Sequence, residues 1–366
     1  MEHNILTLDY WQDQVKYEGY PYPSGTLGCA ALNIPQEKIA EAALLTPSLQ
    51  AVILGVPMGM VQKEQLQTAG NNIFQILDLL REFPPFSLFD NGDFREWIGT
   101  LFTEVAVQNA LDYIRAGSTV NVNAVLQKEY RKGVGCLRVI QAFSQLSWSL
   151  SVYQGAILPF AEALHNSNRT AAEYAILFGQ TFSDHLDLTP EDPSWMAIAN
   201  MSAQYFTAVM PGKEDPQIVK RMHYVSFAGM FRSDLFEGLS VGHAPKLCPI
   251  CGRWFLTTDA RHTKYCGGLA PGDPKGRTCR QIGNLRGRAS RELADDHPLK
   301  AIYERRMDTI RQNVRRGNLE ESLAEEMKRL AKNKLQRAIS DPEYAKTAYP
   351  KEMEQAALKA EAEKLL

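Results

Sequence analysis

Four cysteines within residues 246–291 constrain this chain more than any other feature of its sequence. They occur as Cys248-x2-Cys251, then Cys266 after fourteen intervening residues and Cys279 after twelve more. A two-residue gap lets a tight turn aim two sulfurs at one ion, and four thiolates complete the tetrahedral shell of Zn2+. The spacing therefore predicts a structural zinc ion at Cys248, Cys251, Cys266 and Cys279, with no open position for a catalytic water.

The N-terminal residues and the use of cysteine predict a cytoplasmic protein. Cys29 and Cys136 follow no ligand spacing, and we expect them to be small buried apolar residues. The N-terminal residues MEHNILTLDYWQDQ lack the basic and apolar regions of a signal peptide. In a reducing compartment, clustered cysteines favour a metal over disulfides, which supports the zinc prediction.

The longest stretch without charge, residues 139–161, has the length of a membrane span. It contains three Gln, four Ser and one Pro, however, and these polar groups would all need partners in hydrocarbon. We therefore expect a buried helix of a soluble domain and no membrane partner. At 366 residues and 45% hydrophobic content, the chain is large enough for two or three packed domains.

The hydrophobic pattern predicts a mainly α fold with minor β structure. Aromatic and β-branched residues cluster in a strand-like manner at 204–210 and 221–227, and a short strand or hairpin is expected within the first 30 residues. An amphipathic helix at 227–239 leads into the cysteines. Apolar residues at helical spacing predict further helices at 35–45, at 71–83 before Pro84-Pro85, at 93–117, around 136–164 and at 170–186.

The cysteine segment is expected to fold as a small treble-clef-like module. Residues 253–256 resemble a strand, 257–259 a turn, and 262–265 the segment returning to Cys266, which together predict a hairpin. A short helix is expected from Cys279. Metal binding can stabilise so small a unit, because it supplies about 10 to 16 kcal/mol in zinc-finger peptides. Three aromatic residues would cover the metal by packing, with base stacking as the alternative: Trp254, Phe255 and Tyr265.

A charged helical tail follows the cysteine module. Helices are expected at 299–317 and 318–339, joined by a turn at Gly317-Asn318, and a third helix begins at Asp341-Pro342 and is interrupted near Pro350. The simplest arrangement is an antiparallel helical hairpin. The predicted organisation is a helical body (1–240), a zinc module (241–291) and a charged tail (292–366).

Charge is distributed unevenly, although the formal net charge is only −2. Residues 1–240 contain 15 basic and 25 acidic residues, whereas 241–340 contain 21 basic and 11 acidic, and 246–291 alone contain ten basic and two acidic. A basic module on an acidic body suggests contact with a polyanion, although the two parts could instead neutralise each other. The predicted nucleic-acid contacts are Arg253, Arg261, His262, Lys264, Lys275, Arg277, Arg280, Arg286 and Arg288.

The order of helix, CxxC, aromatic segment, basic-Tyr-Cys and a last cysteine followed by Gly-Asn and Arg resembles the zinc finger of bacterial CGNR-type transcription regulators. In that pattern Gly-Asn-Arg directly follows the last cysteine, whereas here Arg280-Gln281-Ile282 intervene. The phrases GHAPKLCPICGRWFLTTDARHTKYC and APGDPKGRTCRQIG are also similar to an uncharacterised family from clostridia-like bacteria with charged C-terminal helices. The resemblance, over residues 227–290, implies a zinc site at the four cysteines and a DNA-binding role.

Three functions remain open at the level of sequence. The first is a zinc-containing nucleic-acid-binding regulator, with DNA favoured over RNA, whose acidic body senses a ligand or forms a homo-oligomer. The second is an interaction protein in which zinc only staples body to tail. The third and least favoured is an enzyme, because the sequence contains no P-loop, GxGxxG or HExxH motif. Its single local acid/base cluster, Asp184-His185 with Asp187, is more typical of a solvated helix end.

Overall fold

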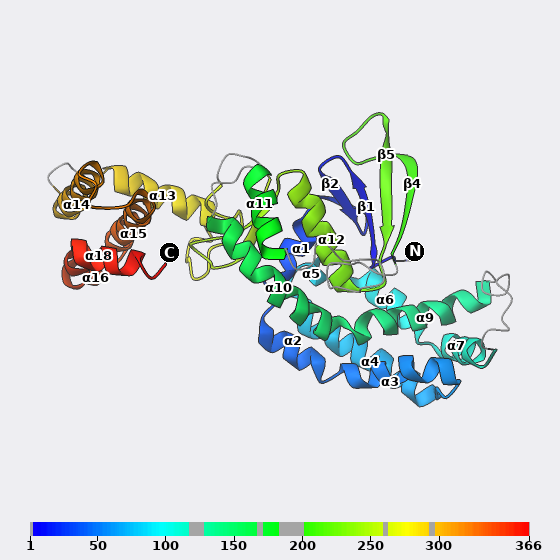
Figure 1. The fold of residues 1–366 in the computed structure, drawn as a ribbon. Coiled ribbons are helices and arrows are strands. Elements are labelled where there is room, and N and C mark those ends of the chain that lie inside the picture. Colours follow the sequence, from blue (N-terminus) through cyan, green and yellow to red (C-terminus); the bar gives the residue numbers. More distant parts are fainter. Residues whose placement is uncertain are drawn as a thin grey trace. The chain divides into compact units, whose positions relative to one another are not determined.

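The computed structural model describes residues 3–116, 128–166, 171–182, 201–258, 263–292 and 297–365 (Figure 1). The fold is mainly α with a small amount of β structure, as predicted. Contacts divide the chain into two compact units. The first unit comprises Met1–Cys248 and Gly252–Thr263, and the second comprises Pro249–Cys251 and Lys264–Leu366. The division into parts at 240 and 291 stays a prediction.

The first unit contains a five-stranded antiparallel sheet in the order β3-β2-β1-β5-β4. The N-terminal strands and the strand-like segment at 204–210 belong to it, whereas of the segment at 221–227 only residues 221–223 lie in β5 and Phe227 begins a helix. Strand β1 pairs with β5, placing Leu8 opposite Met222, and Arg221 donates two hydrogen bonds to Asp9 at 2.7 and 2.8 Å. The sheet thus joins segments about 200 residues apart in the chain. Its strands are β1 (Thr7–Trp11), β2 (Gln14–Tyr17), β3 (Tyr20–Pro23), β4 (Ser202–Val209) and β5 (Pro216–His223).

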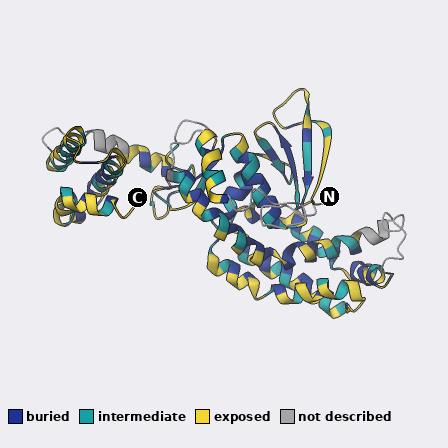
Figure 2. Cartoon of the chain, in the orientation of Figure 1, coloured by how far each residue is buried: buried dark blue, intermediate teal, exposed yellow. Residues whose placement is uncertain are grey.

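Helices make up most of the first unit, and α12 is buried along much of its length (Figure 2). The predicted helices at 35–45 and 227–239 are confirmed as α2 and α12, whereas the helix predicted at 71–83 is the second part of α4, which begins at Lys63 and ends at Leu80. The helices are α1 (Thr26–Ala31), α2 (Gln36–Ala43), α3 (Thr46–Gly55), the 3-10 turn η1 (Val56–Met58), α4 (Lys63–Leu80), α5 (Phe86–Phe89), α6 (Gly92–Leu101), α7 (Glu104–Ala116), α9 (Lys128–Ser144), α10 (Leu146–Asn166), α11 (Ala171–Phe182) and α12 (Phe227–Ser240).

The single helix predicted at 93–117 is wrong, because the structure divides it into α6 and α7. The Phe102 ring packs so closely on Gly70 that a Cβ there would lie 2.6 Å from a ring carbon. The Thr103 hydroxyl donates to the Thr100 carbonyl (3.1 Å) and accepts from the Ala106 N–H (3.4 Å), which caps the new helix. The apolar stripe continues across this break, so periodicity did not reveal it. The segment around 136–164 is likewise divided between α9 and α10.

Four of the seven Gln and Ser side chains in the uncharged stretch are buried: Ser144, Ser147, Ser149 and Gln154. Gln154 is buried and donates to the carbonyls of Ala31 (2.9 Å) and Ile34 (2.8 Å), so it binds the end of α1 to α10. Across the described ranges, no single helix is long and apolar enough to span a membrane. Among the described helices, one pair meets that length and composition requirement: α2 with α3 and η1, which is bent by 47° at the break.

The second unit is helical and has its own apolar core. The predicted turn after the first tail helix is confirmed, since Gly317 has a left-handed φ of 71°, and α14 and α15 pack against each other. Asp341 accepts the N–H groups of Glu343 and Tyr344 and thereby caps the helix that begins at Pro342. The helices are α13 (Cys279–Glu292), α14 (Pro298–Arg315), α15 (Glu321–Ser340), α16 (Pro342–Thr347), α17 (Tyr349–Glu352) and α18 (Gln355–Ala362).

Candidate metal centre

The first two cysteines lie in the turn of a two-stranded hairpin, β6 (Ala244–Leu247) and β7 (Trp254–Thr257). The Cys248 N–H donates to the Arg253 carbonyl and the Gly252 N–H donates to the Cys248 carbonyl, both at 2.9 Å. Gly252 has φ 69°, a left-handed conformation in which a side chain would be strained. The backbone of the CxxC pair is therefore fixed by this turn. The turn needs a left-handed residue directly after the second cysteine, and glycine adopts that conformation without strain.

The predicted pairing of 253–256 with 262–265 is wrong, because β7 pairs with β6, which precedes the cysteines. The reason is non-local. Asn33 holds β7 by donating to the Trp254 carbonyl (2.9 Å) and accepting the Trp254 N–H (2.7 Å), and β6 packs against α10. Trp254 is partly buried against the apolar core of the first unit, and its ring meets His165 edge-on, so its role here is packing.

The four cysteine sulfurs lie within 4.8 Å of one another. The Sγ atoms of Cys251 and Cys266 are 3.6 Å apart. Four Zn–S bonds of about 2.3 Å in a tetrahedron require S–S separations of about 3.8 Å, so the arrangement fits a tetrahedral metal ion. Cys248 and Cys279 are fully buried, whereas Cys251 and Cys266 are partly exposed. The predicted cluster is therefore brought together and could hold a metal ion.

The loop between the third and fourth cysteines is held by Asp273. Its carboxylate accepts the N–H groups of Arg277 (2.8 Å) and Lys275 (3.2 Å) and pairs with the Arg277 guanidinium at 2.5 Å. The bonds from Arg277 lower the pKa of Asp273 to about 2. The Cys279 N–H then donates to the Gly268 carbonyl at 2.9 Å. A Gly/Pro-rich segment without periodicity thus adopts a defined shape that leads the chain to Cys279, the last of the four clustered cysteines.

Helix α13 begins at Cys279, which confirms the helix predicted there. Thr278 and Gln281 cap it reciprocally: the Thr278 hydroxyl accepts the Gln281 N–H (3.2 Å), and the Gln281 side chain accepts the Thr278 N–H (2.8 Å). One turn on, Gly283 lies under the Tyr265 ring, where a Cβ would come within 2.5 Å of three ring carbons. Tyr265, which precedes Cys266, therefore packs on α13, and its covering of a metal ion stays a prediction.

The residues predicted to contact nucleic acid differ in their exposure to solvent. Arg277 is partly buried and paired with Asp273, and Lys246, one of the ten basic residues of the segment, is buried. Arg261 and His262 lie outside the described residues, as does the side chain of Arg288. Five of the predicted residues are exposed: Arg253, Lys264, Lys275, Arg280 and Arg286.

The two cysteines outside the cluster are buried, as predicted. Burial raises the pKa of the Cys136 thiol to about 12 and that of Cys29 still further, with a smaller contribution from Asp234 at Cys29. Both side chains therefore remain protonated thiols at neutral pH. They behave as small apolar core residues, in contrast to the four clustered sulfurs.

Sequence reasoning missed a buried carboxylate, Asp234 on α12. It is fully buried and accepts the N–H groups of Gly25 (3.0 Å), Leu27 (2.7 Å) and Gly28 (3.0 Å) at the start of α1. Desolvation raises its pKa to about 6, although these three hydrogen bonds act in the opposite direction. Asp234 lies within an amphipathic helix, more than 200 residues from its partners, so no local signal marks it. Its contacts lock α1 onto α12.

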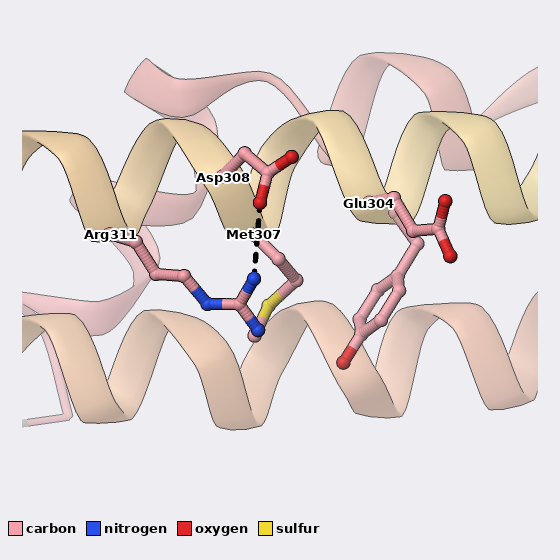
Figure 3. A pocket seen from close by; sticks show the side chains of 5 residues that line it. Glu304, Met307, Asp308 and Arg311 are labelled. Carbon is pink, nitrogen blue, oxygen red and sulfur yellow. Dashed lines mark hydrogen bonds and ion pairs between the residues drawn. The ribbon is translucent and has the colours of Figure 1, made fainter.

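Two other candidate sites offer less chemistry. A shallow pocket on α14 is lined by residues of that one helix, and an ion pair of 3.1 Å joins two of them, Asp308 and Arg311 (Figure 3). These side chains include no nucleophile with an adjacent base. The acid/base cluster Asp184-His185 with Asp187 lies outside the described residues. The other residues lining the pocket are Tyr303, Glu304 and Met307.

Comparison with known proteins gives one match. Residues 196–365 are similar to a family described as "Family of unknown function (DUF6076)", a match that includes β4, β5, the cysteine cluster and the tail helices. The comparison thus supports a resemblance to a family without an assigned function, while a match to CGNR-type zinc-finger proteins is not shown. No curated protein and no solved structure matches the chain.

Proposed function

We propose that this chain is a zinc-containing protein that binds nucleic acid through the segment around its four cysteines. The observation that carries the proposal is the cluster of four sulfurs within 4.8 Å, inside a segment with ten basic and two acidic residues. Four thiolates are the ligand set that structural zinc prefers. The resemblance of this segment to CGNR-type regulators points to a role in transcription.

Zinc bound by these residues would act as a cross-link. A four-thiolate shell leaves no position for a water or substrate, so activity must reside in the surface that the metal holds in shape. The loop bonds of Asp273 and the capping of α13 stabilise that same surface. Exposed cations on a rigid module can neutralise phosphates and release their counterions.

The test combines metal analysis with binding. Full-length protein purified with zinc is expected to retain one zinc per chain and to bind labelled nucleic acid in fluorescence anisotropy. With the five exposed cations as contacts, the slope of log affinity against log salt on duplex DNA would approach about −4.5. The proposal is contradicted if the zinc-loaded protein at about 50 mM salt binds neither DNA nor RNA, even with the weak affinity that is typical of non-specific binding.

A matched control tests whether nucleic-acid affinity depends on charges of the cysteine segment or on surface charge anywhere on the protein. Lys264→Ala and Lys275→Ala remove exposed charges within it, and each should weaken binding and reduce the steepness of the salt slope by about one unit. Arg81→Ala removes an exposed charge at the end of α4 and should leave binding unchanged. Equal losses in all three variants would show that binding does not depend on the cysteine segment.

A further inference from the structure

We propose that α13 is a recognition helix that enters the major groove of duplex DNA and reads base edges with Arg280 and Asn284. This inference rests on the proposed function and specifies its ligand. Arg280 and Asn284 are exposed and stand four residues apart, so they share one face of the helix. Arginine pairs with the O6 and N7 of guanine and asparagine with the N6 and N7 of adenine, both presented in the major groove.

The structure holds α13 through contacts that flank this face and leave Arg280 and Asn284 exposed. Its first residue is the ligand Cys279, Gly283 packs under Tyr265, and the helix also contacts α15. Gln281 is exposed too, but its side chain is used in the capping box with Thr278. These contacts leave the first exposed turns of the helix for a ligand. Residues near the N-terminus of a recognition helix are the ones that reach bases in helix-turn-helix proteins.

The charge around α13 suits a polyanion. Lys264, Lys275 and Arg286 are exposed. Between residues 263 and 286 the sequence has one acidic residue, Asp273, whose side chain is 5% exposed and paired with Arg277. This described stretch therefore presents cations to solvent with almost no exposed carboxylate to repel phosphate.

Duplex DNA fits better than single strands or RNA. Proteins that bind single strands stack bases on exposed aromatic rings, but the one aromatic residue between 263 and 286 is Tyr265, which packs on Gly283. The major groove of A-form RNA is too narrow and deep for a helix to read, whereas that of B-DNA admits one. A helix with polar and cationic side chains therefore favours B-form DNA.

The experiment begins by enriching bound sequences from a random duplex DNA pool with the zinc-loaded full-length protein. Affinity is then measured for the enriched duplex, a scrambled duplex, the enriched strand alone and the same sequence as duplex RNA. We expect enrichment of a sequence containing guanine and adenine and tightest binding to the enriched duplex. Tighter binding to single strands or RNA overturns the inference but leaves the proposed function intact, whereas absence of all binding overturns both.

Variants then test base reading. Arg280→Ala and Asn284→Ala should each lose about tenfold to hundredfold affinity for the enriched duplex and little for the scrambled one. Lys275→Ala should weaken both duplexes equally, and Arg81→Ala neither. Alanine favours the helical state, so α13 should persist, and zinc content and circular dichroism check this. If both variants keep the preference for the enriched duplex, or if no sequence is enriched, α13 does not read bases.

Discussion

Gly283→Ala tests whether the packing of Tyr265 on α13 supports the metal centre. A Cβ at this position would lie within 2.5 Å of the Cδ2 and Cζ atoms of Tyr265 and closest to its Cε2 atom. The residue after Tyr265 is Cys266, which a bound metal ion would hold in place together with the other three cysteines. The added methyl group must therefore push Tyr265 away from α13 and, with it, displace one sulfur of the cluster.

The two opposing effects can be compared. Replacing glycine by alanine inside a helix stabilises it by about 1 kcal/mol, whereas overpacking a close contact costs about 1–3 kcal/mol. We expect the clash to prevail and the module to be destabilised by about 1 kcal/mol. In a Tyr265→Ala background the ring is absent, so only the helix effect remains and Gly283→Ala should become stabilising by about 1 kcal/mol. The sign of the effect thus depends on the ring.

Competition for zinc with a chromophoric chelator gives the measurement, because folding of a small module is linked to metal binding. A loss of about 1 kcal/mol corresponds to about fivefold weaker zinc affinity for Gly283→Ala. The exposed neighbour provides the control, since Asn284→Ala should change zinc affinity little. The reasoning is refuted if Gly283→Ala binds zinc as tightly as the wild type, or if its effect is the same with and without the Tyr265 ring.

Three further predictions concern the ligands and the core. Cys279→Ala should lose the zinc that Cys136→Ala retains, and equal zinc content in native mass spectrometry would contradict the ligand assignment. Asp234 has a raised pKa of about 6, so the folded state holds its proton more tightly than the unfolded state. Its stabilising contribution is therefore full below about pH 4 and is lost as the pH rises to about 6, amounting to about 3 kcal/mol. Urea unfolding between pH 4 and 7 should show this step in the wild type and not in Asp234→Asn. Gln154→Leu removes the donor to the Ala31 and Ile34 carbonyls, of which Ala31 still accepts the Ile34 N–H at 3.4 Å, and should cost about 1–3 kcal/mol. The exposed Gln141→Leu should show no such drop in thermal stability if hydrogen bonding is the cause.

Local patterns allowed much of the fold to be predicted. Apolar residues at a spacing of three and four placed α2, α4, α12, α14 and α15, because one face of each helix must be buried. The division of 93–117 was not predictable in this way, since Phe102 and Thr103 end one helix and begin the next without interrupting the stripe. The contact between Phe102, in the turn after α6, and Gly70 of α4 joins distant parts of the chain, so periodicity contains no record of it.

The sequence by itself determined which four cysteines form the cluster that could hold a metal ion, and the helical character of the chain. Cysteine spacing and side-chain periodicity are short-range properties, and the turn and helix geometries that they require are the same in any fold. Only the tertiary structure decided that β7 pairs with β6, that β1 pairs with β5, and that Asp234 binds the start of α1. These choices depend on which distant surfaces bury each other's apolar groups and satisfy each other's hydrogen bonds, and no local pattern specifies the partner.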